Sequence, residues 1–83
     1  MKDYIATFHT HYGALVFFKE CKKLGVVSEQ KPVPRKLSSS CGTCVAFKAD
    51  SHNFLYGIED VQEDFEACYL DLGANEYRKM SKD

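Results

Sequence analysis

The sequence predicts an α/β fold of the α+β sandwich type, with the ferredoxin-like order β-α-β-β-α-β, a mainly antiparallel sheet and two helices on one face. Three observations favour it: stretches with apolar residues at helical spacing, short stretches that alternate apolar and polar residues, and turn formers between them. The 83 residues are 45% hydrophobic and 13% aromatic, which is enough for one core but not for two. We therefore expect residues 1–83 to form a single domain.

The first strand and the first helix are expected near the N-terminus. Asp3–Phe8 alternates in an aromatic and β-branched context, which is typical of a strand. Thr10 is a suitable N-cap for a helix, and Gly25 supplies its C-terminal stop. Between these two residues the apolar side chains follow helical spacing: Ala14, Phe17, Phe18, Cys21 and Leu24.

A β-hairpin is expected in the middle of the chain. Val26–Arg35 has an extended pattern, but Pro32 and Pro34 cannot donate ladder hydrogen bonds, which favours a sheet edge. Thr43–Ala49 alternates and predicts the third strand. Because a short connection rich in serine and glycine joins the two segments, we expect an antiparallel hairpin with Cys41 at its tip.

The C-terminal part predicts a loop, a second helix and a last strand. Residues 50–57 are rich in turn formers and indicate a loop. Apolar residues then recur at helical spacing: Ile58, Val61, Phe65, Cys68 and Leu72. Acidic residues in the early turns suit a helix N-terminus, and Gly73 ends the pattern. Ala74–Met80 predicts a short strand, and Ser81–Asp83 a frayed tail.

Charge and composition argue against two classes of partner. Eleven Lys and Arg residues against twelve Asp and Glu residues leave a net charge of -1, so the chain lacks the basic field that attracts nucleic acid. The N-terminal residues lack the apolar run of a signal peptide, and no segment has the length of a membrane span. We therefore expect a cytoplasmic protein that binds neither nucleic acid nor membrane, with its four cysteines as thiols.

The two cysteines in the predicted helices are interpreted as structural. Cys21 and Cys68 each fall within an apolar stripe, and free cysteine is among the residues most often buried. Burial raises the pKa of a thiol and makes it a poor nucleophile. Neither residue is therefore a candidate for chemistry.

Cys41 and Cys44 form a C-x-x-C pair, which is found in dithiol exchange and in metal sites. A thioredoxin-type pair opens a helix, whereas this pair leads into a predicted strand, where residues three apart point to opposite faces. The scattered His9, His11 and His52 do not complete a zinc site. We expect no cofactor, and metal binding is the least favoured alternative.

Cys41 suits nucleophilic sulfur chemistry better than the other cysteines. A thiolate is stabilised by nearby cations and by donors that converge in a turn, and Gly42 leaves room for a second reactant. The candidate groups that stabilise the thiolate or bind a partner are Arg35, Lys36, Ser38, Ser39 and Ser40. The alternative is a Ser- and Gly-rich hairpin loop that contains a cysteine by accident.

The segment Pro32–Phe47, PVPRKLSSSCGTCVAF, resembles the selenium/sulfur carrier-like family. The shared marks are a Pro-x-Pro-Arg segment, a run of serines, and a Cys-Gly pair that opens an apolar strand. Thr10–Leu15 and Glu76–Met80 extend the resemblance over nearly the whole chain. The resemblance implies a compact α/β domain in which Cys41 is the marked cysteine. Cys44 stands where family members often have a small apolar residue, so the C-x-x-C is a local elaboration.

The leading functional hypothesis is a carrier, and not a classical enzyme. The Cys41 thiolate would accept a sulfane sulfur or selenium atom from a donor protein and pass it to an acceptor, and Cys44 would release the cargo by forming a disulfide. The alternatives are an interaction domain that docks or forms a homodimer through its open sheet face, and a metal-binding protein. The acidic run Glu59–Glu66 is interpreted as a solvated helix face, and no hydrolase or phosphate-binding motif is present.

Overall fold

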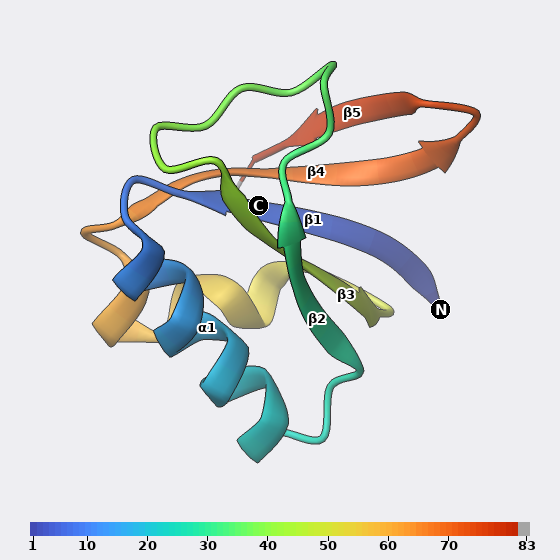
Figure 1. Cartoon of the computed structure of the whole chain (residues 1–83). Helices are drawn as coiled ribbons and strands as arrows, with labels where there is room; N and C mark the ends of the chain where they lie inside the picture. The colour runs from blue at the N-terminus through green and yellow to red at the C-terminus, as the bar shows by residue number, and fades with distance from the viewer. Residues whose placement is uncertain (82–83) are drawn as a thin grey trace.

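The computed structural model describes residues 1–81, and this part of the chain forms a five-stranded antiparallel sheet with one α-helix (Figure 1). Along the sheet the strand order is β2-β3-β1-β4-β5. The elements are β1 (Lys2–Phe8), α1 (His11–Lys23), β2 (Ser28–Pro32), β3 (Thr43–Ala49), β4 (Phe65–Gly73) and β5 (Glu76–Met80). The fold is therefore α+β. Lys82 and Asp83 of the predicted tail lie outside the described residues.

The first strand and helix agree with the prediction. Strand β1 starts one residue before the predicted Asp3. Helix α1 begins at His11 because the Thr10 hydroxyl accepts a hydrogen bond from the Gly13 amide at 3.0 Å, which satisfies one free N–H of the first turn. Gly25 follows the helix with a φ of 74°, a conformation that glycine adopts without steric cost.

Strands β2 and β3 form the predicted antiparallel hairpin, and β2 lies at the sheet edge. Cys41, however, lies at the base of the connection and not at its tip. The Val33 amide donates to the Gly42 carbonyl at 3.1 Å, which extends the pairing beyond the strand ends. Cys41 is thereby held beside the start of β3, while residues 34–40 form the outer part of the loop.

The predicted second helix is wrong, and with it the predicted β-α-β-β-α-β order. One short 3-10 helix, Asn53–Gly57, occupies the segment predicted as a loop, and a second, Glu59–Val61, occupies the start of the predicted helix. Strand β4 then spans residues 65–73, most of which were predicted to be helical. The predicted last strand is confirmed, as β5. The observed order of α-helices and strands in residues 1–81 is β-α-β-β-β-β.

Long-range pairing and a tight turn explain this difference. Strand β4 pairs with β1 along one edge and with β5 along the other, for example Ala6 with Cys68 and Cys68 with Met80. Ala74 and Asn75 have φ angles of 54° and 61°, and this left-handed pair closes a two-residue hairpin between β4 and β5. The apolar spacing of residues 58–72 therefore fits a helix by coincidence.

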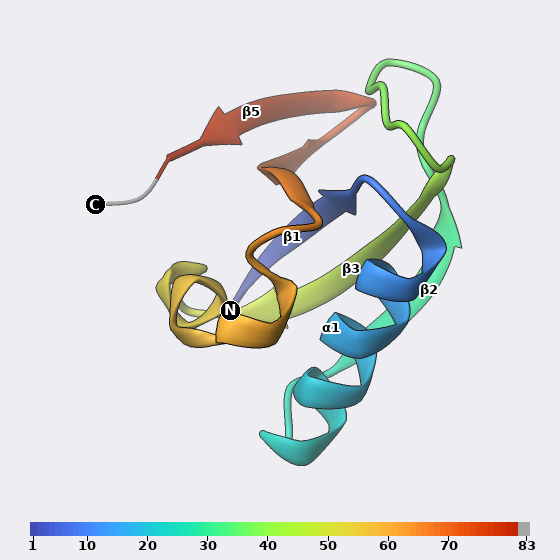
Figure 2. The ribbon, with the colours of Figure 1, turned by 90° about the vertical axis from the view of Figure 1, so that its left-hand side faces the viewer.

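The core lies on one face of the sheet. Figure 2 shows α1 and the 3-10 segment on the same side of the strands. Phe17 of α1 packs against Phe8 and Phe47, with ring centroids 5.5 Å and 5.4 Å apart. The core is completed from the 3-10 helices by Leu55 and Val61, both fully buried. One α-helix and the 3-10 segment thus cover the face that two helices were expected to cover.

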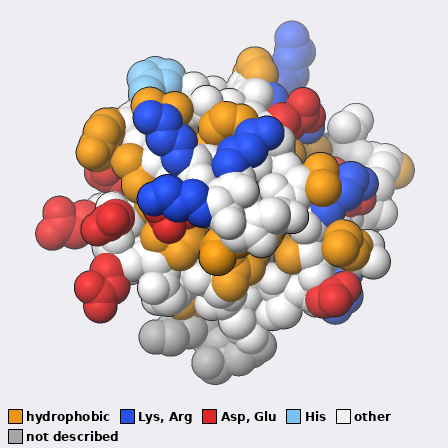
Figure 3. Space-filling view, turned by 90° about the horizontal axis from the view of Figure 1, so that it is seen from below, with side chains coloured by type: hydrophobic (Ala, Val, Ile, Leu, Met, Phe, Trp, Pro, Cys, Tyr) orange, Lys and Arg blue, Asp and Glu red, His pale blue; other side chains and the backbone are white. Residues whose placement is uncertain are grey.

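The outer surface of this layer carries both charged and apolar side chains. Acidic side chains gather at one side of the surface seen from below, while lysines mix with apolar side chains at its centre (Figure 3). Glu59, Asp60 and Glu63 are exposed, but Glu66, the last residue of the predicted solvated helix face, is half-buried in β4. Within residues 1–81 we find no helix with the length and apolar character of a membrane span.

Candidate functional site

Cys41 lies against the end of β1. Its Sγ is 3.3 Å from the Phe8 carbonyl oxygen and 3.4 Å from the Thr43 carbonyl oxygen, so the single thiol hydrogen is donated to one of these acceptors at a time. The Ser39 hydroxyl lies 4.0 Å from the sulfur. Cys41 is half-buried. The sulfur thus lies among two backbone carbonyl oxygens and one hydroxyl.

The other three cysteines are fully buried. Cys21, Cys44 and Cys68 each have 0% of their surface exposed. Burial raises the pKa of Cys21 to about 11, of Cys44 to about 11 and of Cys68 to about 12. The predicted burial of Cys21 and Cys68 is confirmed, although Cys68 comes from a strand. Cys41 is therefore the only cysteine in the described chain with surface open to a reactant.

Cys44 is not paired with Cys41, and all four cysteines are free thiols. Cys44 is opposite Thr7 in the β1–β3 register, on the sheet face away from the helix. Its thiol donates to the Pro32 carbonyl at 3.7 Å. Besides burial, which dominates, Lys31 works to lower the Cys44 pKa and Cys41 to raise it.

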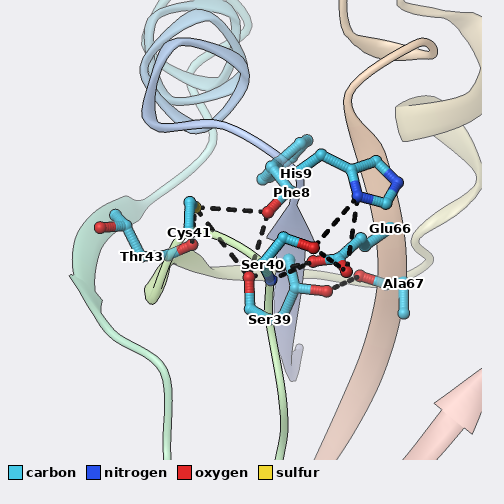
Figure 4. A network of polar contacts seen from close by, with 9 residues as sticks. Phe8, His9, Ser39, Ser40, Cys41, Thr43, Glu66 and Ala67 are labelled. Carbon is cyan, nitrogen blue, oxygen red and sulfur yellow. Dashed lines mark hydrogen bonds and ion pairs between the residues drawn. The ribbon is translucent and has the colours of Figure 1, made fainter.

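Two of the predicted serines hold a carboxylate from β4 (Figure 4). The Ser39 hydroxyl donates to Glu66 Oε1 at 3.0 Å, and the Ser40 amide donates to the same oxygen at 3.1 Å. The Ser40 hydroxyl donates to Glu66 Oε2 at 3.0 Å. Ser38 is exposed and takes no part in this network. The anion that these donors face in the structure is thus Glu66.

Two histidines join the same loop from the start of α1. His9 Nδ1 lies 3.5 Å from Glu66 Oε2 and 3.4 Å from the Ser40 hydroxyl. His11 Nδ1 lies 2.8 Å from the Thr43 hydroxyl, on the other side of Cys41. Both histidines are exposed, as the sequence predicts. They also fasten the two ends of the Ser40–Thr43 segment to the rest of the fold.

Hydrogen bonding keeps Glu66 ionised. Burial works to raise its pKa, but the Ser40 amide and hydroxyl and the Ser39 hydroxyl lower it by a larger amount, and His9 adds to the lowering. The net effect is a lowered pKa for the Glu66 carboxyl. Hydrogen bonds to an ionised acceptor are stronger than those to a neutral one. Glu66 is therefore a charged anchor for the loop at neutral pH.

The predicted cations do not approach Cys41. Arg35 and Lys36 lie exposed in a turn, in which the Leu37 amide donates to the Pro34 carbonyl at 3.0 Å. Lys36 lines a shallow hollow with residues of the β4–β5 turn, Asn75, Glu76 and Tyr77. Neither cation has a hydrogen bond or ion pair with the cysteine in the described part of the chain.

Gly42 provides the open space expected of it. Its φ is 75°, and no atom lies within 4 Å of the position that a Cβ would occupy. The left-handed backbone requires glycine here, and the site beside Cys41 stays accessible.

Three contributors to the site could not be assigned from the sequence. Glu66 was placed on a helix face, and His9 and His11 were given no link to Cys41. The hydrogen bonds that join these residues to the loop span 26 to 32 positions of sequence. The alternation of apolar and polar residues in Phe65–Ala67, FEA, is the one local signal that Glu66 belongs to a strand.

Comparison with known proteins identifies a family for most of the chain. A family model described as "Putative Se/S carrier protein-like" matches residues 3–69. The chain belongs to this family. The match covers Cys41, Glu66, His9 and His11, and it ends inside β4. No curated protein and no solved structure matches the chain.

The described residues form no metal site. Among residues 1–81, no group of three or more His, Cys, Asp or Glu side chains is arranged to hold a metal ion. Glu66 and the histidines instead use their polar atoms within the loop network.

Proposed function

We propose that this protein is a sulfur or selenium carrier, in which Cys41 accepts the atom from a donor and passes it to a partner protein. The observation that carries the proposal is that Cys41 is only half-buried, while the other three cysteines are fully buried with raised pKa values. The family description supports the choice of cargo. A carrier needs one accessible thiol and no second catalytic group.

Loading is an exchange of one sulfur–sulfur bond for another. The Cys41 thiol first loses its proton to solvent, and the thiolate attacks the terminal sulfur of a donor persulfide, R–S–SH. The donor bond breaks, a Cys41 persulfide forms, and the donor leaves as the thiolate R–S⁻. No net oxidation or reduction takes place, because the transferred atom keeps its oxidation level. A selenium cargo follows the same exchange with selenium as the transferred atom.

We propose that the partner's own nucleophile removes the cargo. Attack on the terminal atom of the Cys41 persulfide transfers that atom and restores the Cys41 thiolate. The alternative, attack by Cys44, requires a Cys44 thiolate. With a pKa of about 11, about one Cys44 side chain in ten thousand is ionised at pH 7. Release by the partner's nucleophile is therefore expected to be faster than release by Cys44.

Arg35 and Lys36 are proposed to contact the partner. They lie on the exposed outer part of the loop that carries Cys41 at its base. From that position they are better placed for an acidic surface of the partner than for the sulfur. Replacing both by glutamine should therefore slow transfer to a partner but leave loading from a small-molecule persulfide unchanged.

The test is loading of the reduced protein with glutathione persulfide, followed by intact mass and peptide mapping. The wild type should gain one sulfur atom on the Cys41 peptide, and Cys41→Ser should gain none. Cys44→Ala is the matched control and should load as the wild type does. Loading of Cys41→Ser on another cysteine would refute the assignment. Slower unloading of Cys44→Ala to an excess of cyanide or thiol would restore a release role for Cys44.

A second candidate, an interaction domain, is favoured by the sheet face away from α1. This face is hollowed, and charged residues surround its floor of Ile5 and Ala46: Asp3, Glu29, Lys31, Lys48 and Asp71. Antiparallel sheets commonly leave one face open to solvent, and a partner protein can dock on such a face. Sedimentation equilibrium at several concentrations separates the two candidates, because a monomer that loads sulfur leaves the carrier proposal alone.

A further inference from the structure

Glu66 binds two consecutive residues of the Cys41 loop at once. One carboxylate oxygen accepts from the Ser39 hydroxyl and the Ser40 amide, and the other accepts from the Ser40 hydroxyl (Figure 4). Strand β4, which carries Glu66, is paired with β1 and β5 and is therefore a rigid support. The carboxylate fastens a loop to a sheet, and it does so at the residues directly before Cys41.

The Phe8 carbonyl oxygen links Ser39, which binds the carboxylate, to the Cys41 sulfur. The Ser39 hydroxyl lies 3.0 Å from both Glu66 Oε1 and the Phe8 carbonyl oxygen, and its single proton serves one of them at a time. The Cys41 thiol donates to the same Phe8 carbonyl. Removal of the carboxylate therefore affects the position of Ser39, and through it the contact that holds the sulfur.

We propose that Glu66 is a positioning residue that clamps residues 39–41 in a closed state, with the Cys41 sulfur held against two backbone carbonyls, and that Cys41 becomes reactive when this clamp opens. The inference rests on the proposed function for its purpose, because a carrier must shield its thiol between partners.

The closed state protects the sulfur for a chemical reason. The single thiol hydrogen is donated to the Phe8 or the Thr43 carbonyl oxygen, and both oxygens direct partial negative charge toward the sulfur. Nucleophilic attack therefore requires the sulfur to turn away from both carbonyls. Gly42 permits such a movement, because no atom lies within 4 Å of the position that its Cβ would occupy and a glycine backbone tolerates wide φ and ψ changes.

The test is the rate of Cys41 alkylation by iodoacetamide in the native reduced protein at neutral pH, with each cysteine followed by peptide mass. Glu66→Gln keeps the side-chain shape but removes the negative charge, which weakens the hydrogen bonds from the Ser39 hydroxyl and the Ser40 amide, and it removes the acceptor of the Ser40 hydroxyl. We expect Cys41 to be alkylated about five to ten times faster in this variant. Cys21, Cys44 and Cys68 should remain protected. The matched control is Glu63→Gln, which removes an exposed carboxylate nearby and should stay within about twofold of the wild type.

Two further variants separate positioning from general support. Glu66→Asp retains the carboxylate, and we expect it to return the Cys41 rate toward that of the wild type. Ser40→Ala removes a single hydrogen bond of the clamp and should accelerate Cys41 by about two- to threefold. If Glu66→Gln unfolds and all four cysteines react alike, the Ser40→Ala rate decides. An unchanged or slower Cys41 rate in whichever of these two variants is folded would overturn the inference.

The alkylation assay is independent of sulfur transfer. If Cys41 does not load sulfur but Glu66→Gln still accelerates its alkylation, the carrier proposal fails and the clamp stands. If Cys41 loads sulfur but the variants leave its alkylation unchanged, the clamp fails and the carrier proposal stands.

Discussion

Replacing Glu66 with alanine is expected to lower the free energy of unfolding by about 2 kcal/mol at pH 7. The variant loses the acceptors of the Ser40 amide and the Ser40 hydroxyl, whereas Ser39 can still donate to the Phe8 carbonyl. Two bonds to a charged group are therefore lost. Each is assigned about 1 kcal/mol, below the usual range for charged acceptors, because 22% of the Glu66 side chain is exposed and water replaces part of the interaction.

The stability difference between the wild type and Glu66→Ala is expected to depend on pH. Burial works to raise the Glu66 pKa, but hydrogen bonds from Ser40 and Ser39 lower it overall from the ordinary 4.5. A group with a lowered folded pKa stabilises the protein fully above its unfolded pKa, and the stabilisation is lost as the pH falls through the folded value. The difference between wild type and Glu66→Ala should therefore narrow below about pH 4.5.

Urea unfolding followed by circular dichroism measures both effects, with Glu63→Ala as the control for charge. Measurements would run from pH 7 down to the lowest pH at which the wild type is folded. A difference that stays constant over this range would refute the role given to the ionised carboxylate. So would a Glu66→Ala variant as stable at pH 7 as the control.

Three other substitutions test the elements around the site by the same urea assay. Thr10→Ala removes the N-cap of α1 and should destabilise by about 1 kcal/mol, while Thr10→Ser should retain most of it. Gly13→Ala should destabilise by about 1–3 kcal/mol despite a better helix propensity, because the new Cβ would lie 2.5 Å from Asp64 Cβ; a gain in stability would contradict this contact. Ala74→Gly should stabilise by about 0.5–1 kcal/mol, because Ala74 has a φ of 54°; a loss would show that the turn does not strain alanine.

The parts of the fold that the sequence predicted correctly depend on neighbouring residues. The Thr10 hydroxyl reaches an amide three residues away, and Gly25 stops the helix by its own backbone conformation. The prolines near β2 exclude it from a central position because they lack an N–H. Such signals can be read from the sequence because their physical causes lie within a few residues.

The error over residues 58–72 has the opposite origin. Apolar residues at helical spacing and at strand spacing coexist there, so the local pattern permits both structures. Pairing with the free edge of β1 stabilises this segment as strand β4. The left-handed Ala74-Asn75 pair then reverses the chain, so that β5 pairs with the other edge of β4. Pairing between distant strands overrode the local pattern.

The candidate site divides in the same way. The sequence by itself was enough to predict Cys41 as the candidate cysteine, in a loop rich in serine and glycine, because these residues are consecutive. Only the tertiary structure decided what surrounds the sulfur: the Phe8 carbonyl lies 33 residues away in the chain, and Glu66 lies 26 residues from Ser40. The sheet brings β1, β4 and the loop together, and residues so far apart in sequence carry no mutual signal until the strands have paired.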